Sequence, residues 1–92
     1  METINLHLYA WVVRGKQRTA ILKAISRPKT PTQIRKNSLQ FNGKISLNNT
    51  SDILRQFARK GIAVCLNAEA KVGRLYKLTD EGEKIRDVLF ED

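Results

Sequence analysis

Residues 46–62 read SLNNTSDILRQFARKGI, and this stretch carries the signals of a helix with both ends defined. Ser46 is predicted to cap the first backbone N–H groups with its hydroxyl oxygen. Gly61 is predicted to end the helix in the left-handed conformation, which a residue without Cβ adopts at little cost. Phe57 and Ile62 occupy the two positions whose apolar contact closes such an end. The stretch therefore predicts one well-bounded helix.

The two faces of this helix differ in chemistry. The mainly apolar side, at steps of three and four residues, consists of Leu47, Thr50, Leu54, Phe57 and Ala58. The other side carries short amides, hydroxyls, a carboxylate and a guanidinium, from Asn48, Asn49, Ser51, Asp52 and Arg55. Side chains of this second kind read base edges in the major groove of DNA. Taken alone, the pattern favours the solvated face of an ordinary core helix, so the rest of the chain decides.

Charge is unevenly distributed along the 92 residues, whose formal net charge is +8. From Arg14 to Lys77 there are fifteen Lys and Arg residues but only two acids, Asp52 and Glu69. From Thr79 onwards there are six acids and two bases. A basic body with an acidic tail favours a polyanionic partner for the body alone. The alternative is a merely soluble basic protein, which charge by itself does not exclude.

Several functional classes conflict with the residues present. Cys65 is the only cysteine and His7 the only histidine, so one chain contains neither a disulfide nor the ligands of a Cys/His zinc site. A catalytic triad would have to use His7, and no phosphate-binding glycine-rich loop is present. We therefore expect no enzymatic activity, no metal, no cofactor and no small-molecule ligand.

The apolar segment 4–13 is too short to span a bilayer and lacks the features of a signal peptide. We expect a cytoplasmic protein without membrane contact. Alternating apolar residues make residues 1–13 either a short strand or a short helix, packed on the domain or on a second copy of it. Residues 38–45 contain the turn signal Asn42-Gly43, and a fragment of strand is one alternative there.

Two helices are predicted between these segments. The first spans residues 14–26 and ends before Pro28, which cannot continue a helix. The second spans residues 31–37 and begins with a capping box, in which the side chains of Thr30 and Gln33 each bond the backbone of the other.

After Gly61 the pattern becomes extended. Residues 62–66 and 74–78 predict the two strands of a hairpin whose tip, residues 67–73, is bounded by two cations, Lys71 and Arg74. A last helix is predicted within residues 79–92, capped by the Thr79 hydroxyl. The apolar stripe of that helix consists of Ile85, Val88 and Leu89.

The predicted order over residues 1–92 is helix, helix, helix, hairpin, helix, without a linker or repeat. This is one winged helix-turn-helix domain, mainly α with a small β-hairpin (α+β): a three-helix core, a wing and a C-terminal helix. The segments TSDILRQFARKGIAVCL (50–66), GRLYKLTDEG (73–82) and WVVRGKQR (11–18) resemble archaeal winged-helix transcription regulators of the MarR/ArsR-like group. The resemblance extends over about residues 9–88.

The resemblance implies sequence-specific binding of double-stranded DNA by a small transcriptional regulator. The third helix, residues 46–60, would enter the major groove and the wing, residues 67–74, would contact the backbone or minor groove. The base-facing candidates by position are Asn48, Asn49, Ser51, Asp52 and Arg55. The backbone and wing candidates are Thr32, Gln33, Lys36, Ser46, Arg59, Lys71 and Arg74.

Two features depart from the family pattern. Asp52 stands where a neutral or basic residue is usual, and its carboxylate would repel phosphate, accept from a cytosine amino group, or pair with Arg55 or Gln56. The connection from Ile34 to Leu47 is also longer than the usual tight turn, which affects how the third helix is aimed.

The acidic tail and Asp52 favour an alternative function, a winged-helix adaptor for protein–protein or RNA binding without sequence-specific DNA binding. A palindromic DNA site would require a homodimer with half-sites about 34 Å apart. The candidate dimer surfaces are the segment 4–13 and the last helix with Ile85, Val88 and Leu89, although both would equally serve to close the monomer core.

Overall fold

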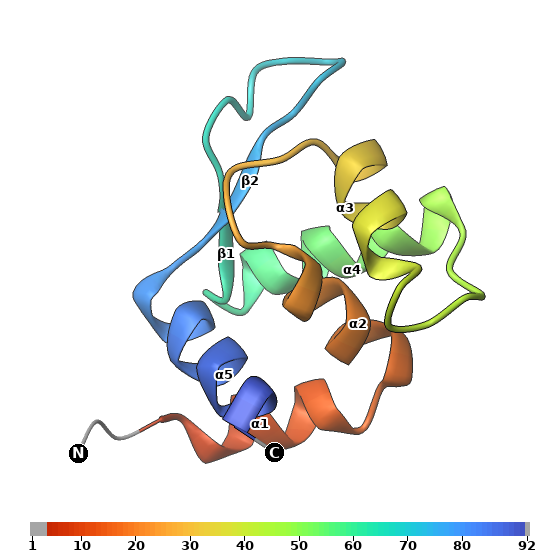
Figure 1. Ribbon diagram of the computed structural model, residues 1–92. Coiled ribbons are helices and arrows are strands. Elements are labelled where there is room, and N and C mark those ends of the chain that lie inside the picture. The colour runs from red at the N-terminus through yellow and green to blue at the C-terminus, as the bar shows by residue number, and fades with distance from the viewer. Residues whose placement is uncertain (1–3, 92) are drawn as a thin grey trace.

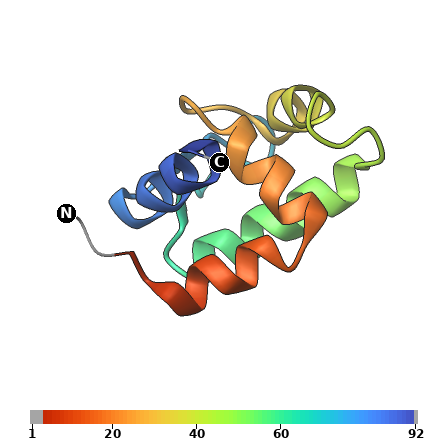
Figure 2. The ribbon, with the colours of Figure 1, turned by 60° about the horizontal axis from the view of Figure 1, so that its bottom comes forward.

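Five α-helices and one antiparallel hairpin make up residues 4–91, the part of the chain that the computed structural model describes (Figure 1). The helices are α1 (Leu6–Val13), α2 (Lys16–Ala24), α3 (Pro31–Ser38), α4 (Leu47–Arg59) and α5 (Asp80–Glu91), and the strands are β1 (Ala63–Cys65) and β2 (Tyr76–Leu78). Helix α2 lies at the centre, against α1, α3 and α5 (Figure 2). The predicted winged helix-turn-helix is confirmed, with α3 and α4 as the helix pair and the hairpin as the wing.

The N-terminal segment forms a helix, so the strand alternative is wrong. Asn5 caps α1 by accepting a hydrogen bond from the Leu8 backbone at 3.1 Å. Val12 is fully buried, and the Trp11 ring packs edge-on against Phe57 of α4 with ring centroids 5.8 Å apart. The apolar residues of this segment follow a helical period once the Asn5 cap sets the start. Residues 1–3 of the predicted extension lie outside the described residues.

The next two helices lie where the sequence places them, with shifted ends. Helix α2 begins at Lys16 because Gly15 has extended backbone angles, and it ends at Ala24, two residues before the predicted end. The capping box of α3 is confirmed: the Thr30 hydroxyl accepts from the Gln33 backbone at 3.3 Å, and the Gln33 side chain accepts from the Thr30 backbone at 3.0 Å.

The connection between α3 and α4 contains no strand, so the predicted strand fragment in residues 38–45 is wrong. The wing sheet instead gains a bridge from Lys29, whose backbone N–H and carbonyl pair with those of Tyr76 at 3.0 and 2.9 Å. The connection is held by side chains: Arg35 donates to the Ile45 carbonyl at 2.9 Å, and Gln17 donates to the Lys44 carbonyl at 3.1 Å.

Both predicted ends of α4 are confirmed. The Ser46 hydroxyl accepts from the Asn49 backbone at 3.0 Å. Gly61 has a φ of 78°, and the Ile62 N–H donates to the Phe57 carbonyl at 2.9 Å, as in a helix end with a left-handed residue.

The apolar face of α4 is rotated from the predicted one. The buried residues of the helix are Thr50, Ile53, Leu54 and Phe57. Leu47 and Ala58, which were assigned to the buried side, are exposed, and Leu47 is 44% exposed. The cause is the position of α2 and α1, which cover the Ile53 side of the helix and leave the Leu47 side facing the wing.

The wing strands are shorter than predicted. β1 pairs with β2 from the pair Ala63 and Leu78 to the pair Cys65 and Tyr76, and neither strand extends further towards the tip. Beyond this pairing the Leu66 N–H still donates to the Leu75 carbonyl at 2.8 Å, and the Asn67 side chain then accepts from the Leu75 N–H at 2.7 Å. Figure 1 shows the resulting loop projecting beyond the helices.

Helix α5 closes the core. The Thr79 hydroxyl accepts from the Gly82 N–H at 3.1 Å, which confirms the predicted cap. Ile85 and Leu89 are buried, whereas Val88 is only partly buried. Gly82 lies directly on Ile62, and a Cβ at this position would overlap the Ile62 carbonyl oxygen. Within residues 4–91, no helix is both long enough and apolar enough to cross a membrane.

Candidate nucleic-acid interface

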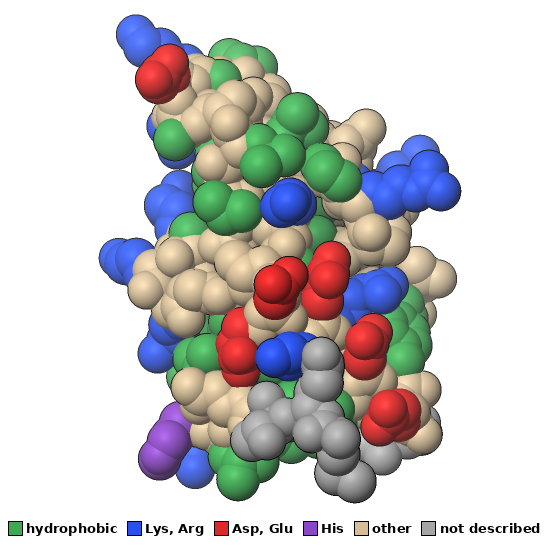
Figure 3. All heavy atoms as spheres, turned by 90° about the vertical axis from the view of Figure 1, so that its left-hand side faces the viewer, with side chains coloured by type: hydrophobic (Ala, Val, Ile, Leu, Met, Phe, Trp, Pro, Cys, Tyr) green, Lys and Arg blue, Asp and Glu red, His purple; other side chains and the backbone are tan. Residues whose placement is uncertain are grey.

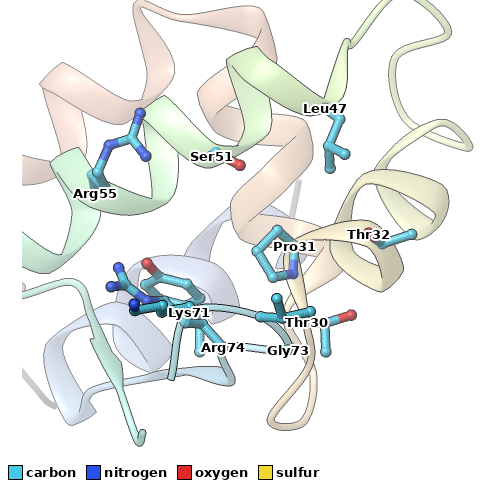
Figure 4. Close-up of a pocket in the computed structure, with 11 residues that line it drawn as sticks. Thr30, Pro31, Thr32, Leu47, Ser51, Arg55, Lys71, Gly73 and Arg74 are labelled. Carbon is cyan, nitrogen blue, oxygen red and sulfur yellow. The ribbon is translucent and has the colours of Figure 1, made fainter. Parts of the chain in front are cut away.

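A groove of about 440 Å³ lies between the start of α3, one side of α4 and the wing (Figure 4). Its α4 wall presents Leu47, Ser51 and Arg55, which are four residues apart and therefore share one side of the helix. The remaining lining residues come from the α3 start and the wing: Thr30, Pro31, Thr32, Lys71, Val72, Gly73, Arg74 and Tyr76. Three of the lining side chains are cationic and none is acidic.

The wing contributes to this groove the two cations that bound the predicted hairpin tip, Lys71 and Arg74. The Arg74 side chain is braced by donating to the Ala70 carbonyl at 2.7 Å. Gly73 has a φ of 70°, which the turn at the tip requires. Figure 4 shows Lys71 and Arg74 on the opposite side of the groove from the α4 residues. Val72 between them is 88% exposed, so the tip also carries an apolar side chain.

The outward face of α4 carries Asn48, Asp52 and Arg55, all exposed. Arg55 forms an ion pair with the Asp52 carboxylate, which is one of the outcomes expected for that residue. In Figure 4 the Arg55 guanidinium points away from the wing. Both side chains are more than half exposed, so the pair contributes only about 0.2–1 kcal/mol to stability. Its main effect is to neutralise the carboxylate on the exposed face of the helix.

The other flank of α4 faces the start of α2. A second cavity of about 430 Å³ lies there, lined by Lys16, Gln17 and Arg18 of α2 and by Asn49 and Asp52 of α4, among other residues. The Asn49 amide donates to the Gln17 side chain at 3.2 Å. Cations therefore border α4 on both sides.

The predicted site residues divide into two groups in the structure. Those that line the groove beside the wing are Thr32, Ser51, Arg55, Lys71 and Arg74. Those that lie outside it are Asn48, Asn49, Asp52, Gln33, Lys36, Ser46 and Arg59. Within the second group, Gln33 and Ser46 use side-chain oxygens as helix caps, and Asn49 is bonded to α2. All seven are exposed, so the groove leaves their proposed roles untested.

Six lining residues were not among the predicted site residues, namely Thr30, Pro31, Leu47, Val72, Gly73 and Tyr76. Leu47 was assigned to the core, and its place at the first turn of α4 was the available signal that it lies near a helix end. Tyr76 alternates with Lys77 along β2, which predicts opposite faces for the two side chains but does not show that the Tyr76 face borders a groove.

None of the acidic residues within positions 4–91 lines this groove, although Asp52 pairs with Arg55, which does. Three of them, Asp80, Glu81 and Glu83, are in the first turn of α5, where the helix dipole favours negative charge. Figure 3 shows the Asp and Glu side chains gathered mainly in one area, with Lys and Arg side chains around it. The charge asymmetry of the sequence is therefore also an asymmetry of the surface.

Comparison with known proteins gives a likeness of fold. No protein-family model and no curated protein matches the sequence. Among solved structures, one described as the type III plasmid segregation protein TubR is similar, with a TM-score of 0.70 and 12% sequence identity. The match covers 100% of this chain and 91% of that chain. At this identity the likeness supports the winged-helix fold alone, and membership of the MarR/ArsR-like group stays a prediction.

Proposed function

We propose that the protein binds double-stranded DNA sequence-specifically, as a small cytoplasmic transcriptional regulator of the MarR/ArsR-like kind. In this proposal α4 enters the major groove and the wing contacts the backbone or the minor groove. The observation that carries it is the groove beside α4, whose lining includes two cations from the wing and one from α4 but no acidic side chain.

The dimensions and chemistry of α4 suit the major groove. The helix has 13 residues and is therefore about 20 Å long, and a B-DNA major groove about 12 Å wide admits one helix. Its outward face offers Asn48 and Arg55, which suit adenine and guanine edges respectively. Lys71 and Arg74 beside it suit phosphate oxygens.

The start of α3 supplies further contacts to the backbone. Thr32 lines the groove at the positive end of the helix dipole, where phosphate binds favourably. Gln33 and Lys36 are exposed on the same helix. These contacts would orient the protein on the duplex without reading sequence.

The adaptor function is the alternative, and the structure weakens one of its two supports. Asp52 argued against DNA because a carboxylate repels phosphate, but Arg55 neutralises it. The acidic residues that remain lie chiefly on α5, away from the groove. The likeness to TubR adds plasmid segregation as a second biological setting for the protein, in place of transcription.

We further propose that α1 carries a homodimer contact. Leu6 is 71% exposed and Val13 is 42% exposed, and their spacing of seven residues places them on one side of the helix. Ile85 and Leu89 of α5 are buried within the monomer, so that helix closes the core. Leu6→Glu should shift the protein towards monomers in sedimentation experiments, and an unchanged mass distribution would contradict this role of α1.

Selection of bound fragments from a random duplex library, followed by binding measurements at increasing salt, tests the main proposal. If about six or more phosphates are contacted, affinity should fall by about 10³-fold or more between 50 and 200 mM salt. The selected fragments would also reveal any half-site symmetry. A protein that binds no duplex at low salt would refute DNA binding and favour the adaptor function.

A further inference from the structure

Tyr76 combines a buried ring with an accessible hydroxyl. The residue is only 5% exposed, yet it lines the groove beside α4. The hydrogen bonds of Tyr76 to residues in the described range 4–91 all use its backbone, so its hydroxyl has no partner there. No fully buried side-chain polar atom of those residues lacks a partner, so the Tyr76 oxygen reaches the surface, and Tyr76 lines the groove. A donor of this kind is available to a ligand there.

The backbone on either side of this side chain is tightly held. On one side Tyr76 pairs with Cys65 in β1. On the other side its N–H and carbonyl both bond Lys29, at 2.9 and 3.0 Å. The phenol is therefore placed in the groove before any ligand arrives, which reduces the entropy lost on binding.

The same bridge brings a second donor to the groove. Helix α3 begins directly after Lys29, and Thr32 is its second residue. The Thr32 N–H has no acceptor among the residues that the structure describes, and it lies at the positive end of the helix dipole. Lys71 and Arg74 add two positive charges from the wing. Phosphate oxygens, which only accept hydrogen bonds and carry negative charge, match this set of donors.

We propose that the Tyr76 hydroxyl donates to a phosphate of the DNA backbone in this groove, with Lys71 and Arg74 neutralising its charge and the Thr32 N–H available to a further phosphate oxygen. The inference rests on the proposed DNA binding and specifies which part of the nucleic acid the groove holds. Because the contact is to the backbone, Tyr76 contributes equally to all sequences and fixes the distance between α4 and the wing along one strand.

Tyr76→Phe removes the hydroxyl and keeps the buried ring. Binding to selected and unrelated duplexes should weaken alike, by about tenfold, as expected for the loss of a hydrogen bond to a charged group. The melting temperature should stay within error of wild type. Ser26→Ala, which removes an exposed hydroxyl outside the lining of the groove, is the control and should bind as wild type. Unchanged affinity of Tyr76→Phe would overturn the inference.

Duplexes that carry one neutral methylphosphonate at successive positions locate the phosphate. At one position the methylphosphonate should weaken binding by the wild-type protein but hardly weaken binding by Tyr76→Phe. Such non-additivity shows that the Tyr76 hydroxyl interacts with the phosphate at that position. If the wild-type protein binds DNA, but at every position the affinity losses caused by the methylphosphonate and by Tyr76→Phe are additive, the inference is wrong while the proposed function stands. If wild type binds no duplex, the proposed function itself fails.

A titration with inorganic phosphate separates the two sources of such an anion. If the ring signals of Tyr76 shift in the nuclear magnetic resonance spectrum at low phosphate concentration, and no methylphosphonate position couples to Tyr76→Phe, the groove takes a free anion. That result would overturn the assignment to the DNA backbone.

Discussion

Asp52→Asn tests the placement of α4 most directly. Asp52 is one of two acids between Arg14 and Lys77, and it lies on the exposed face of α4, paired with Arg55. The substitution keeps the size and one hydrogen-bond acceptor of the side chain but removes its charge. If this face lies against DNA, the change removes a repulsion between carboxylate and phosphate and also frees Arg55 from its partner.

The size of the effect follows from the Coulomb energy. One carboxylate about 6 Å from one phosphate in a water-like medium is repelled by about 0.7 kcal/mol, or about threefold in binding constant. Several phosphates border a major groove, so binding to unrelated duplexes should strengthen by about three- to tenfold at low salt. The slope of log affinity against log salt should steepen by about one. Binding to the preferred duplex should strengthen less, because Asp52 no longer holds the Arg55 side chain in place for its base.

Fluorescence anisotropy with labelled duplexes over a salt series measures both quantities. Asp87→Asn on α5 is the matched control, since it makes the same change in net charge on an exposed residue of another element. The two variants are compared at 0.15 M salt, where charges more than about 8 Å apart are largely screened, so the control should leave binding almost unchanged there. Equal effects of the two substitutions would show that only net charge matters and that α4 does not face DNA.

Three other substitutions test the wing and the packing. Lys71→Ala with Arg74→Ala should weaken binding to all duplexes alike and reduce the salt slope by about two, and an unchanged slope would place the wing off the DNA. Gly61→Val should lower the free energy of unfolding by about 1 kcal/mol or more in denaturant titrations, because φ is 78° there, and an unshifted curve would contradict the strain argument. Gly82→Ala should lower it by about 1–3 kcal/mol, because a Cβ there overlaps a backbone carbonyl, and wild-type stability would show that α5 shifts freely.

Helix ends were predictable because their chemistry is local. The Ser46 cap and the Thr30–Gln33 capping box each join residues three apart, and the Gly61 stop needs only the preceding turn. Such signals lie within one turn of the chain and need no knowledge of the rest of the fold. The order of elements, and with it the fold, follows from these ends and from the change of period after Gly61.

The direction in which α4 faces depends on neighbours that the helix pattern does not specify. Leu47, Ile53 and Leu54 are all apolar, and they span more of the helix circumference than the core covers. The sequence pattern favoured Leu47 as buried, but α1 and α2 cover the Ile53 side. Leu47 therefore lines the groove instead of the core. In the proposed complex with DNA, its apolar side chain would suit contact with a thymine methyl group.

The contribution of Lys29 to the wing sheet had no sequence signal. Its two hydrogen bonds to Tyr76 use backbone atoms only, so any residue at this position would form them. The pair is separated by more than half of the chain, and a single bridge leaves no alternating pattern. Consequently the groove wall at Tyr76, which depends on this bridge, was not predictable from residue types.

The length of the connection before α4 raised doubt about the orientation of that helix. Its polar contacts show that the orientation is fixed. Ile45 is 2% exposed, and its carbonyl accepts from Arg35 of α3, while Lys44 accepts from Gln17 of α2. Gln17 also accepts from the Asn49 amide in the first turn of α4. The connection and the helix start are therefore tied to two other helices, and the bridge at Lys29 ties the start of α3 to the wing. These contacts join α4 to α2 and α3, and α3 to the wing, so the extra length of the connection adds loop surface without loosening the angle between α4 and the wing.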